Sequence, residues 1–154
     1  NDWSVRPNMV FATSLPYSPV SEEIRKQVLS KIKQELLTPR GLRTLTPVSA
    51  AYKGIYFGDQ TQRDQAYHQG TIWPWLFGHF ADGYLRIHGK SGLSFIKGYY
   101  EEFSQTLTEH GVGTVSEIYD GDPPYTPRGA ISQAWSVAEI LRVHQLIEEY
   151  ESSE

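Results

Sequence analysis

The chain has 154 residues, of which 39% are hydrophobic and 21% charged, as is typical of one globular domain with a sizeable core. The formal net charge is −4, and the densest basic stretch, residues 25–33, is interleaved with Glu22, Glu23 and Glu35 as on a solvated helix face. We therefore expect no nucleic-acid partner, which would require a basic surface. The sequence has no cysteine, which excludes disulfides and thiolate metal sites and is compatible with a cytoplasmic location.

No run of residues approaches the ~20 apolar positions that a membrane span needs, and no signal-peptide pattern opens the chain, so no membrane partner is expected.

The first residues, Asn1-Asp2-Trp3, lack an initiator methionine. We expect them to lie inside a longer protein, with a processed N-terminus as the alternative.

Four segments have apolar residues at helical spacing. The first covers Ile24 to Leu37, with Ser18 or Ser21 as a candidate N-cap, and it ends at Pro39 and Gly41. The other three segments cover residues 73–88, 93–107 and 132–150. A short Gly-Lys-Ser-Gly stretch joins the second segment to the third, which favours an antiparallel helical hairpin.

Two long loops separate these helices, at residues 38–72 and 111–131. Both are rich in glycine, and they contain clusters of aromatic and acidic residues. Loops of this length are uncommon in compact domains and are often functional. The expected architecture is therefore a helical scaffold with functional loops at the helix ends.

Several common kinds of site are not predicted. The five histidines show no paired metal-binding spacing, and the start of a calcium-loop pattern at Asp120 and Asp122 is broken by Pro123-Pro124. The glycines of residues 111–116 lack the third glycine and the preceding strand of a dinucleotide-binding fingerprint. No nucleophile elbow of the G-x-S-x-G type occurs. We expect neither a metal nor a cofactor.

Glu117 differs from the other glutamates, most of which lie on polar helix faces. It stands between Val115 and Ile118 in a glycine-rich segment, which predicts partial burial. A carboxylate that is moved out of water needs bonding partners or a chemical role. The spacing leaves two interpretations open, a catalytic carboxylate and a structural ion pair, for example with Arg128.

A second polar cluster comprises Asp59-Gln60, Asp64 and residues 67–75. Amides, an acid and a histidine among aromatic rings suit a sugar, whose hydroxyls bond to polar groups while its C–H faces lie on rings. The alternative is packing at a helix start, with Thr71 as cap and Pro74 in the first turn. By themselves these residues permit a polar-ligand pocket without requiring one.

Taken together, these segments resemble the C-terminal region of the amylo-α-1,6-glucosidase domain of glycogen debranching enzymes. The likeness extends over nearly the whole chain. The segments that match are Arg6-Pro7-Asn8, residues 36–45, Gly58-Asp59-Gln60, residues 67–75, Ser116-Glu117-Ile118, residues 120–124, Pro127-Arg128-Gly129 and residues 133–139.

The resemblance implies an all-α fold in which residues 1–154 are a single partial domain, the C-terminal portion of an (α/α)6 toroid. It implies inverting hydrolysis of α-1,6-linked glucose at branch points of glycogen or limit dextrin, with Glu117 as the general base. The corresponding substrate-binding residues are expected to be Asp59, Gln60, Tyr67, His68, Trp73, Asp120 and Arg128.

Inversion requires a carboxylic acid that protonates the leaving oxygen and a carboxylate that activates water, about 6.5–9.5 Å apart. In the family the acid is an Asp of an earlier segment that has no match here, and nothing in the resemblance assigns the role to Asp59 or Asp64. We therefore expect little hydrolase activity from the chain alone. A partial toroid would expose apolar helix faces, so we expect self-association or reliance on the rest of the domain.

Two alternatives remain at this point. A related toroidal glycosidase, trehalase-like or glucoamylase-like, would differ in residues 42–66 and 119–131 and would be recognised by a panel of substrates. A noncatalytic glucan-binding module would keep the aromatic rings for affinity and would not depend on the carboxylate of Glu117.

Overall fold

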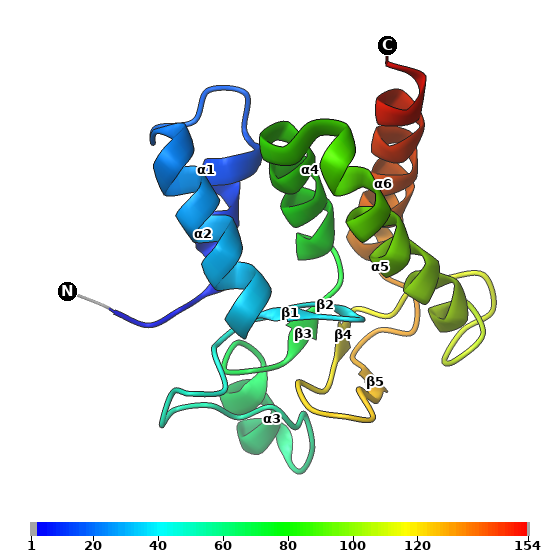
Figure 1. Cartoon of the computed structure of the whole chain (residues 1–154). Helices are drawn as coiled ribbons and strands as arrows, with labels where there is room; N and C mark the ends of the chain where they lie inside the picture. Colours follow the sequence, from blue (N-terminus) through cyan, green and yellow to red (C-terminus); the bar gives the residue numbers. More distant parts are fainter. Residues whose placement is uncertain (1–2, 154) are drawn as a thin grey trace.

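The computed structural model describes residues 3–153, so the expectation drawn from Asn1 and Asp2 falls outside the described residues. Figure 1 shows the long helices together on one side of a small sheet, with the aromatic-rich loops on the other side. The long helices are α2 (Glu22–Glu35), α4 (Leu76–His88), α5 (Leu93–Thr106) and α6 (Ala134–Ser152). The short ones are η1 (Pro7–Val10), α1 (Phe11–Ser14), α3 (Gln60–Ala66) and η2 (Gly89–Gly92).

The long helices begin close to where the apolar spacing places them. Helix α2 starts after Ser21, whose hydroxyl accepts a hydrogen bond from the N–H of Ile24, while Ser18 instead donates to the carbonyl of Ala12. Helix α4 starts at Leu76, three residues later than predicted, because Trp73 belongs to a strand. Sequence spacing therefore predicted these helices well but not the strand that precedes α4.

The predicted antiparallel hairpin of α4 and α5 is confirmed by their aromatic contacts. Near the start of α4, Phe77 lies 5.3 Å from Phe103 near the end of α5, measured between ring centroids. At the other end, Tyr84 lies 4.8 Å from Phe95. Helix α4 also contacts α1, α2 and α6, so the core surrounds it. The side chains buried most completely there include Val10, Ile32, Phe77, Phe80, Leu85, Ile96 and Val143.

The expected all-α class is correct for this scaffold but incomplete. The two long loops pair into an antiparallel sheet of order β1-β2-β3-β4-β5. Its strands are β1 (Leu37–Thr38), β2 (Gly41–Arg43), β3 (Ile72–Trp73), β4 (Ile118–Tyr119) and β5 (Pro127–Arg128). Strands of two or three residues are too short to show the alternation by which strands are recognised in a sequence. The sheet lies across one end of the helices and connects the first loop to the second (Figure 1).

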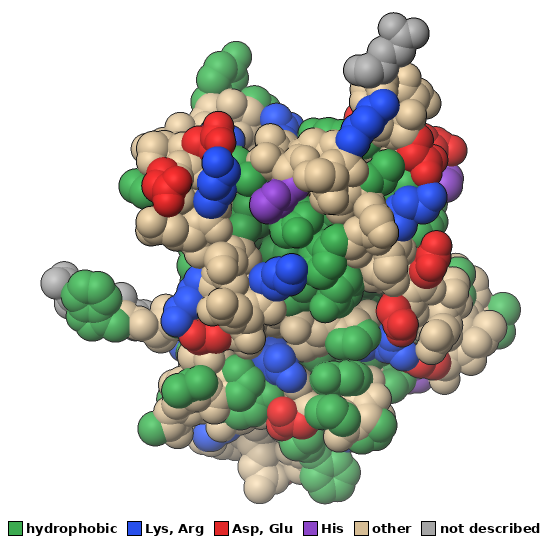
Figure 2. Space-filling view, in the orientation of Figure 1, with side chains coloured by type: hydrophobic (Ala, Val, Ile, Leu, Met, Phe, Trp, Pro, Cys, Tyr) green, Lys and Arg blue, Asp and Glu red, His purple; other side chains and the backbone are tan. Residues whose placement is uncertain are grey.

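The helical side of the molecule has an apolar surface between α2 and α5. Figure 2 shows hydrophobic side chains gathered there, with basic side chains beside them. Pro39, Phe95 and Tyr99 line a shallow groove in this region, and the ammonium of Lys33 lies 4.2 Å from the centroid of the Phe95 ring. Within residues 3–153, no helix has the length and apolar character that crossing a membrane requires.

Candidate functional site

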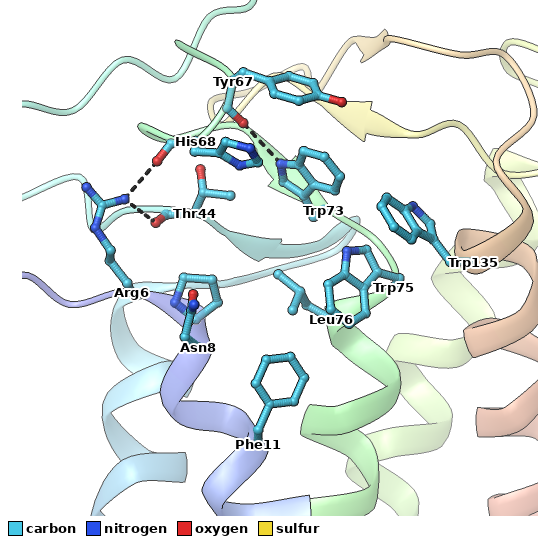
Figure 3. Close-up of a pocket in the computed structure, with 11 residues that line it drawn as sticks. Arg6, Asn8, Phe11, Thr44, Tyr67, His68, Trp73, Trp75, Leu76 and Trp135 are labelled. Carbon is cyan, nitrogen blue, oxygen red and sulfur yellow. Dashed lines mark hydrogen bonds between the residues drawn. The ribbon is translucent and has the colours of Figure 1, made fainter. Parts of the chain in front are cut away.

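A pocket of about 650 Å³ opens at the sheet end of α4, where several aromatic rings converge (Figure 3). Its wall comes from segments throughout the chain, including η1, α1, the residue after β2, β3 and the starts of α4 and α6. The lining residues are Arg6, Pro7, Asn8, Phe11, Thr44, Tyr67, His68, Trp73, Trp75, Leu76 and Trp135. Of the residues predicted to bind substrate, this set contains Tyr67, His68 and Trp73.

The rings of the pocket form pairs of nearly parallel planes. His68 stacks on Trp73 with centroids 5.1 Å apart and planes 18° apart, and Trp75 stacks on Trp135 at 5.7 Å and 30°. Phe11 extends the second pair, 5.8 Å from Trp75. Trp135 is 45% exposed, so part of this surface faces solvent. Flat apolar faces with polar groups between them bind ligands that are flat and amphipathic.

Hydrogen bonds fix the polar rim of the pocket. The indole Nε1 of Trp73 donates to the carbonyl oxygen of Tyr67 at 3.1 Å. The guanidinium of Arg6 donates to the carbonyls of His68 at 2.8 Å and Thr44 at 3.2 Å (Figure 3). These bonds join the N-terminal segment, the residue that follows β2 and the loop before β3, so three parts of the chain hold the rings in place.

Glu117 lies just before β4, and its partial burial is confirmed. Val115 is 1% exposed and Ile118 is fully buried, while Glu117 itself is half-buried. The hydroxyl of Tyr67 donates to Oε1 of Glu117, and the N–H of Ala130 donates to Oε2 at 2.8 Å. The carboxylate therefore lies directly behind a ring that lines the pocket.

The alternative of an ion pair between Glu117 and Arg128 is wrong. The guanidinium of Arg128 instead contacts Oδ2 of Asp120, through Nη2 at 2.9 Å and Nε at 3.1 Å. The Asp120 side chain is only 4% exposed, and its other oxygen accepts a hydrogen bond from the N–H of Tyr56 at 2.8 Å. In this structure Asp120 and Arg128 hold the loops together, and their contact with substrate remains a prediction.

Burial shifts the protonation equilibria of two pocket residues in opposite senses. Burial and the adjacent Glu117 carboxylate raise the pKa of Tyr67, so its phenol remains a hydrogen-bond donor. Burial and the positive charge of Arg6 lower the pKa of His68. A neutral His68 has one ring nitrogen that donates and one that accepts a hydrogen bond.

The two loops are also joined behind the pocket by three close-packed glycines. The hydroxyl of Tyr52 donates to Oδ1 of Asp122 at 3.0 Å, and Gly54, Gly70 and Gly121 surround that hydroxyl and ring. A Cβ atom on Gly121 would lie 2.3 Å from the carbonyl oxygen of Gly70. Only glycine permits this approach, so the glycine-rich composition of both loops has a packing reason.

Asp59 and Gln60 lie away from the pocket wall, at the start of α3. Asp59 is the N-cap of this helix, and its carboxylate accepts from the N–H of Gln62 at 2.9 Å while the Gln62 side chain accepts from the N–H of Asp59. The pair is a capping box, which the spacing of an acid and an amide three residues apart predicts. Substrate contact by these two residues is not seen in the pocket lining and remains a prediction.

Some lining residues were not assigned a role from the sequence. Arg6, Asn8, Trp75 and Trp135 lie inside the segments that match the family, so their motifs were a usable signal. Phe11 had no such signal, because an aromatic residue in a short helix would be assigned to the hydrophobic core.

The geometry defines a class of protein, one with an aromatic-lined pocket and an adjacent half-buried carboxylate on a helical scaffold. The chain belongs to the amylo-alpha-1,6-glucosidase family, which matches residues 1–142, so the resemblance seen in the motifs is confirmed. The chain is also similar to the glycogen debranching enzyme of Saccharomyces cerevisiae (strain ATCC 204508 / S288c), with 28% identity over 96 residues. That match covers 58% of this chain and 6% of the yeast protein.

Proposed function

We propose that this chain is part of a glycoside hydrolase that removes α-1,6-linked glucose at branch points of glycogen or limit dextrin with inversion. It supplies the general base, Glu117, and one wall of the sugar pocket. The observation that supports this most directly is the position of the Glu117 carboxylate, bonded to Tyr67 at the pocket wall. Family membership supplies the substrate class.

The pocket suits a glucose unit in size and chemistry. The faces of Trp73, Trp75 and Trp135 offer apolar surface for the sugar C–H groups, and His68 and Asn8 offer polar groups for hydroxyls. Protein pockets for small ligands typically have volumes of about 300–1,000 Å³, so one sugar unit with part of its neighbour fits. The proposal also assigns substrate contacts to four residues of the surrounding loops, namely Asp59, Gln60, Asp120 and Arg128.

In the proposed reaction, Glu117 accepts a proton from a water molecule while the oxygen of that water attacks the anomeric carbon. The bond from that carbon to the leaving oxygen breaks, and a carboxylic acid on the opposite face donates its proton to the leaving oxygen. The resemblance assigns that acid to a segment outside this chain. The chain therefore acts with the rest of an (α/α)6 toroid, and alone it has little activity. The same proposal includes that the rest of the domain, or a second copy of the chain, covers the apolar surface between α2 and α5.

The test is glucose release from a limit dextrin by the intact protein, comparing wild type with Glu117→Gln. The amide keeps the size of the side chain but cannot accept the proton. A fall in kcat of about 10³-fold or more, with dextrin binding retained, is expected, and each tenfold corresponds to about 1.36 kcal/mol of barrier. Unchanged release would remove Glu117 from the mechanism.

A noncatalytic glucan-binding module is the second candidate, and one observation favours it. The pocket is lined by rings and does not include Glu117 in its wall. If Glu117→Gln binds and hydrolyses like wild type, this second candidate replaces the first. A trehalase-like or glucoamylase-like specificity would instead appear as faster cleavage of trehalose or linear maltooligosaccharides than of the branch-point substrate.

A further inference from the structure

We propose that the backbone turn Gly129–Ala130 is a positioning element for Glu117, fixed in place by the ion pair between Arg128 and Asp120. The inference rests on the proposed function of Glu117 and adds residues to it that do not line the pocket. It concerns how the carboxylate is oriented, not how the sugar is bound.

The turn contacts Glu117 through both backbone and side chain. The N–H of Glu117 donates to the carbonyl of Ala130 at 3.0 Å, and the N–H of Ala130 donates to the Oε2 atom of Glu117 at 2.8 Å. The second bond fixes one carboxylate oxygen, while the Tyr67 hydroxyl binds the other. Each oxygen thus has one donor, which leaves its remaining lone pair for a water molecule.

Gly129 lies against the same carboxylate. Its φ angle is +68°, and a Cβ atom there would lie 2.4 Å from Oε2 of Glu117 and 3.1 Å from Cδ. A side chain at this position would have to push the carboxylate out of its present rotamer. The position therefore requires glycine for its contact with Glu117 as well as for its backbone angle.

The turn is held where it is by the strand before it. β5 pairs with β4 in the register Ile118↔Arg128 and Tyr119↔Pro127, so residues 128 and 118 lie opposite each other. Arg128 then contacts the buried carboxylate of Asp120, the residue that follows β4. The contact of the Arg128 guanidinium with this buried carboxylate favours one position of the strand and of the turn that follows it.

Orientation matters for a general base because its lone pair must point at the attacking water. A displacement of about 1 Å in such a group can lower the rate on the order of 10²-fold. Loss of the turn contact should therefore lower kcat with little change in KM.

The chain offers a matched control for the decisive variant. Gly113 has a φ angle of +70°, nearly the same as that of Gly129, and a Cβ atom there would meet no atom within 4 Å. Gly113→Ala and Gly129→Ala therefore introduce the same backbone strain, and they differ in the contact with Glu117. Both are made in the intact protein, beside wild type and Glu117→Gln, and kcat and KM of glucose release are measured.

We expect Gly129→Ala to lower kcat by about 10²-fold with KM within about twofold, while Gly113→Ala remains close to wild type. Equal behaviour of the two glycine variants, with Glu117→Gln inactive, would overturn the inference and leave the proposed function standing. An active Glu117→Gln would overturn both.

A second pair of variants decides the question if Gly129→Ala does not fold. Arg128→Gln removes the charge that contacts Asp120, and Arg128→Lys restores a cation there. A loss of kcat at constant KM in the first variant, with partial recovery of kcat in the second, supports the positioning role. A rise in KM alone in both variants would mean that Arg128 acts on the substrate, and it would overturn the role proposed here.

Discussion

At the scale of single residues, Tyr67 has two roles at once. Its ring lines the pocket and contacts His68 and Trp73, with centroids 4.8 and 4.9 Å away, and its hydroxyl donates to Glu117. In the proposed reaction, recognition of the sugar and orientation of the carboxylate would therefore be linked through one side chain. The link runs over the 50 residues of sequence that separate Tyr67 from Glu117.

Removal of the Tyr67 hydroxyl should separate these two roles. Tyr67→Phe keeps the ring in the pocket but takes away one of the two donors that hold the carboxylate. A hydrogen bond to a charged group contributes roughly 1.5–3 kcal/mol, so we expect kcat to fall on the order of 10- to 100-fold with KM little changed.

Trp135→Ala is the contrasting variant for steady-state kinetics on limit dextrin. It removes an exposed ring of the pocket and leaves the contacts of Glu117 in place, so its effect should fall on KM. If Tyr67→Phe changed KM and left kcat intact, the hydroxyl would be a substrate ligand and not a partner of the base.

At this scale the sequence predicted part of the site but not the partners of Glu117. The apolar neighbours of Glu117 predicted its partial burial correctly, and the motifs that match the family singled out Tyr67, His68 and Trp73, which do meet in the pocket. The partners of Glu117 could not be predicted, because a donor 50 residues away and a backbone N–H of a turn leave no local pattern. For the same reason Arg128 was offered as a partner of Glu117 when Asp120 binds it.

At the scale of elements, the helices were predictable and the strands were not. Helix α2 shows the reason, since its apolar spacing runs over several turns and Ser21 gives it a recognisable cap. Strand β3 has two residues, Ile72 and Trp73, and its partners β2 and β4 lie far away in the sequence. Such strands form because tertiary packing brings them together, so no local propensity signals them.

Helix α3 gives a prediction that separates structure from substrate binding. Asp59→Ala removes the N-cap and its capping box, and we expect the free energy of unfolding to fall by about 1 kcal/mol. Asp59→Ser keeps a capping oxygen and should stay close to wild type. Both are read from urea unfolding of the chain, followed by circular dichroism.

The kinetic constants of the same two variants test the role that the family resemblance gives to Asp59. An increase in KM in Asp59→Ser, which retains the cap, would show that the carboxylate also contacts the sugar. Equal stability of Asp59→Ala and wild type would contradict the capping role.

At the scale of the whole molecule, buried tyrosines make the free energy of unfolding depend on pH in the alkaline range. Burial and the contact with Asp122 raise the pKa of Tyr52 to about 12, and burial also raises the pKa of Tyr99, Tyr119 and Tyr150. A tyrosine in the unfolded chain has a pKa of about 10. The folded state therefore retains protons that the unfolded state loses above that pH.

The sign of the effect follows from this difference. Stability from these groups is complete below about pH 10 and decreases as the pH rises through about 12. We expect the urea midpoint to fall between about pH 9 and 11.5, and to fall less in Tyr52→Phe, whose own contribution to the pH dependence is absent. An equal fall in both proteins would show that Tyr52 titrates alike in the folded and unfolded states.

The placement of the pocket at one end of the helices also determines where the chain can accept added sequence. The pocket wall, the Glu117 site and the sheet occupy the same end, whereas the exposed connection from Leu15 to Pro19 and the C-terminal end of α6 lie at the opposite end (Figure 1). Exposed connections tolerate insertions because little backbone bonding depends on them. Peptide tags, reporter domains or evolutionary insertions at these two places would extend the molecule without touching its chemistry.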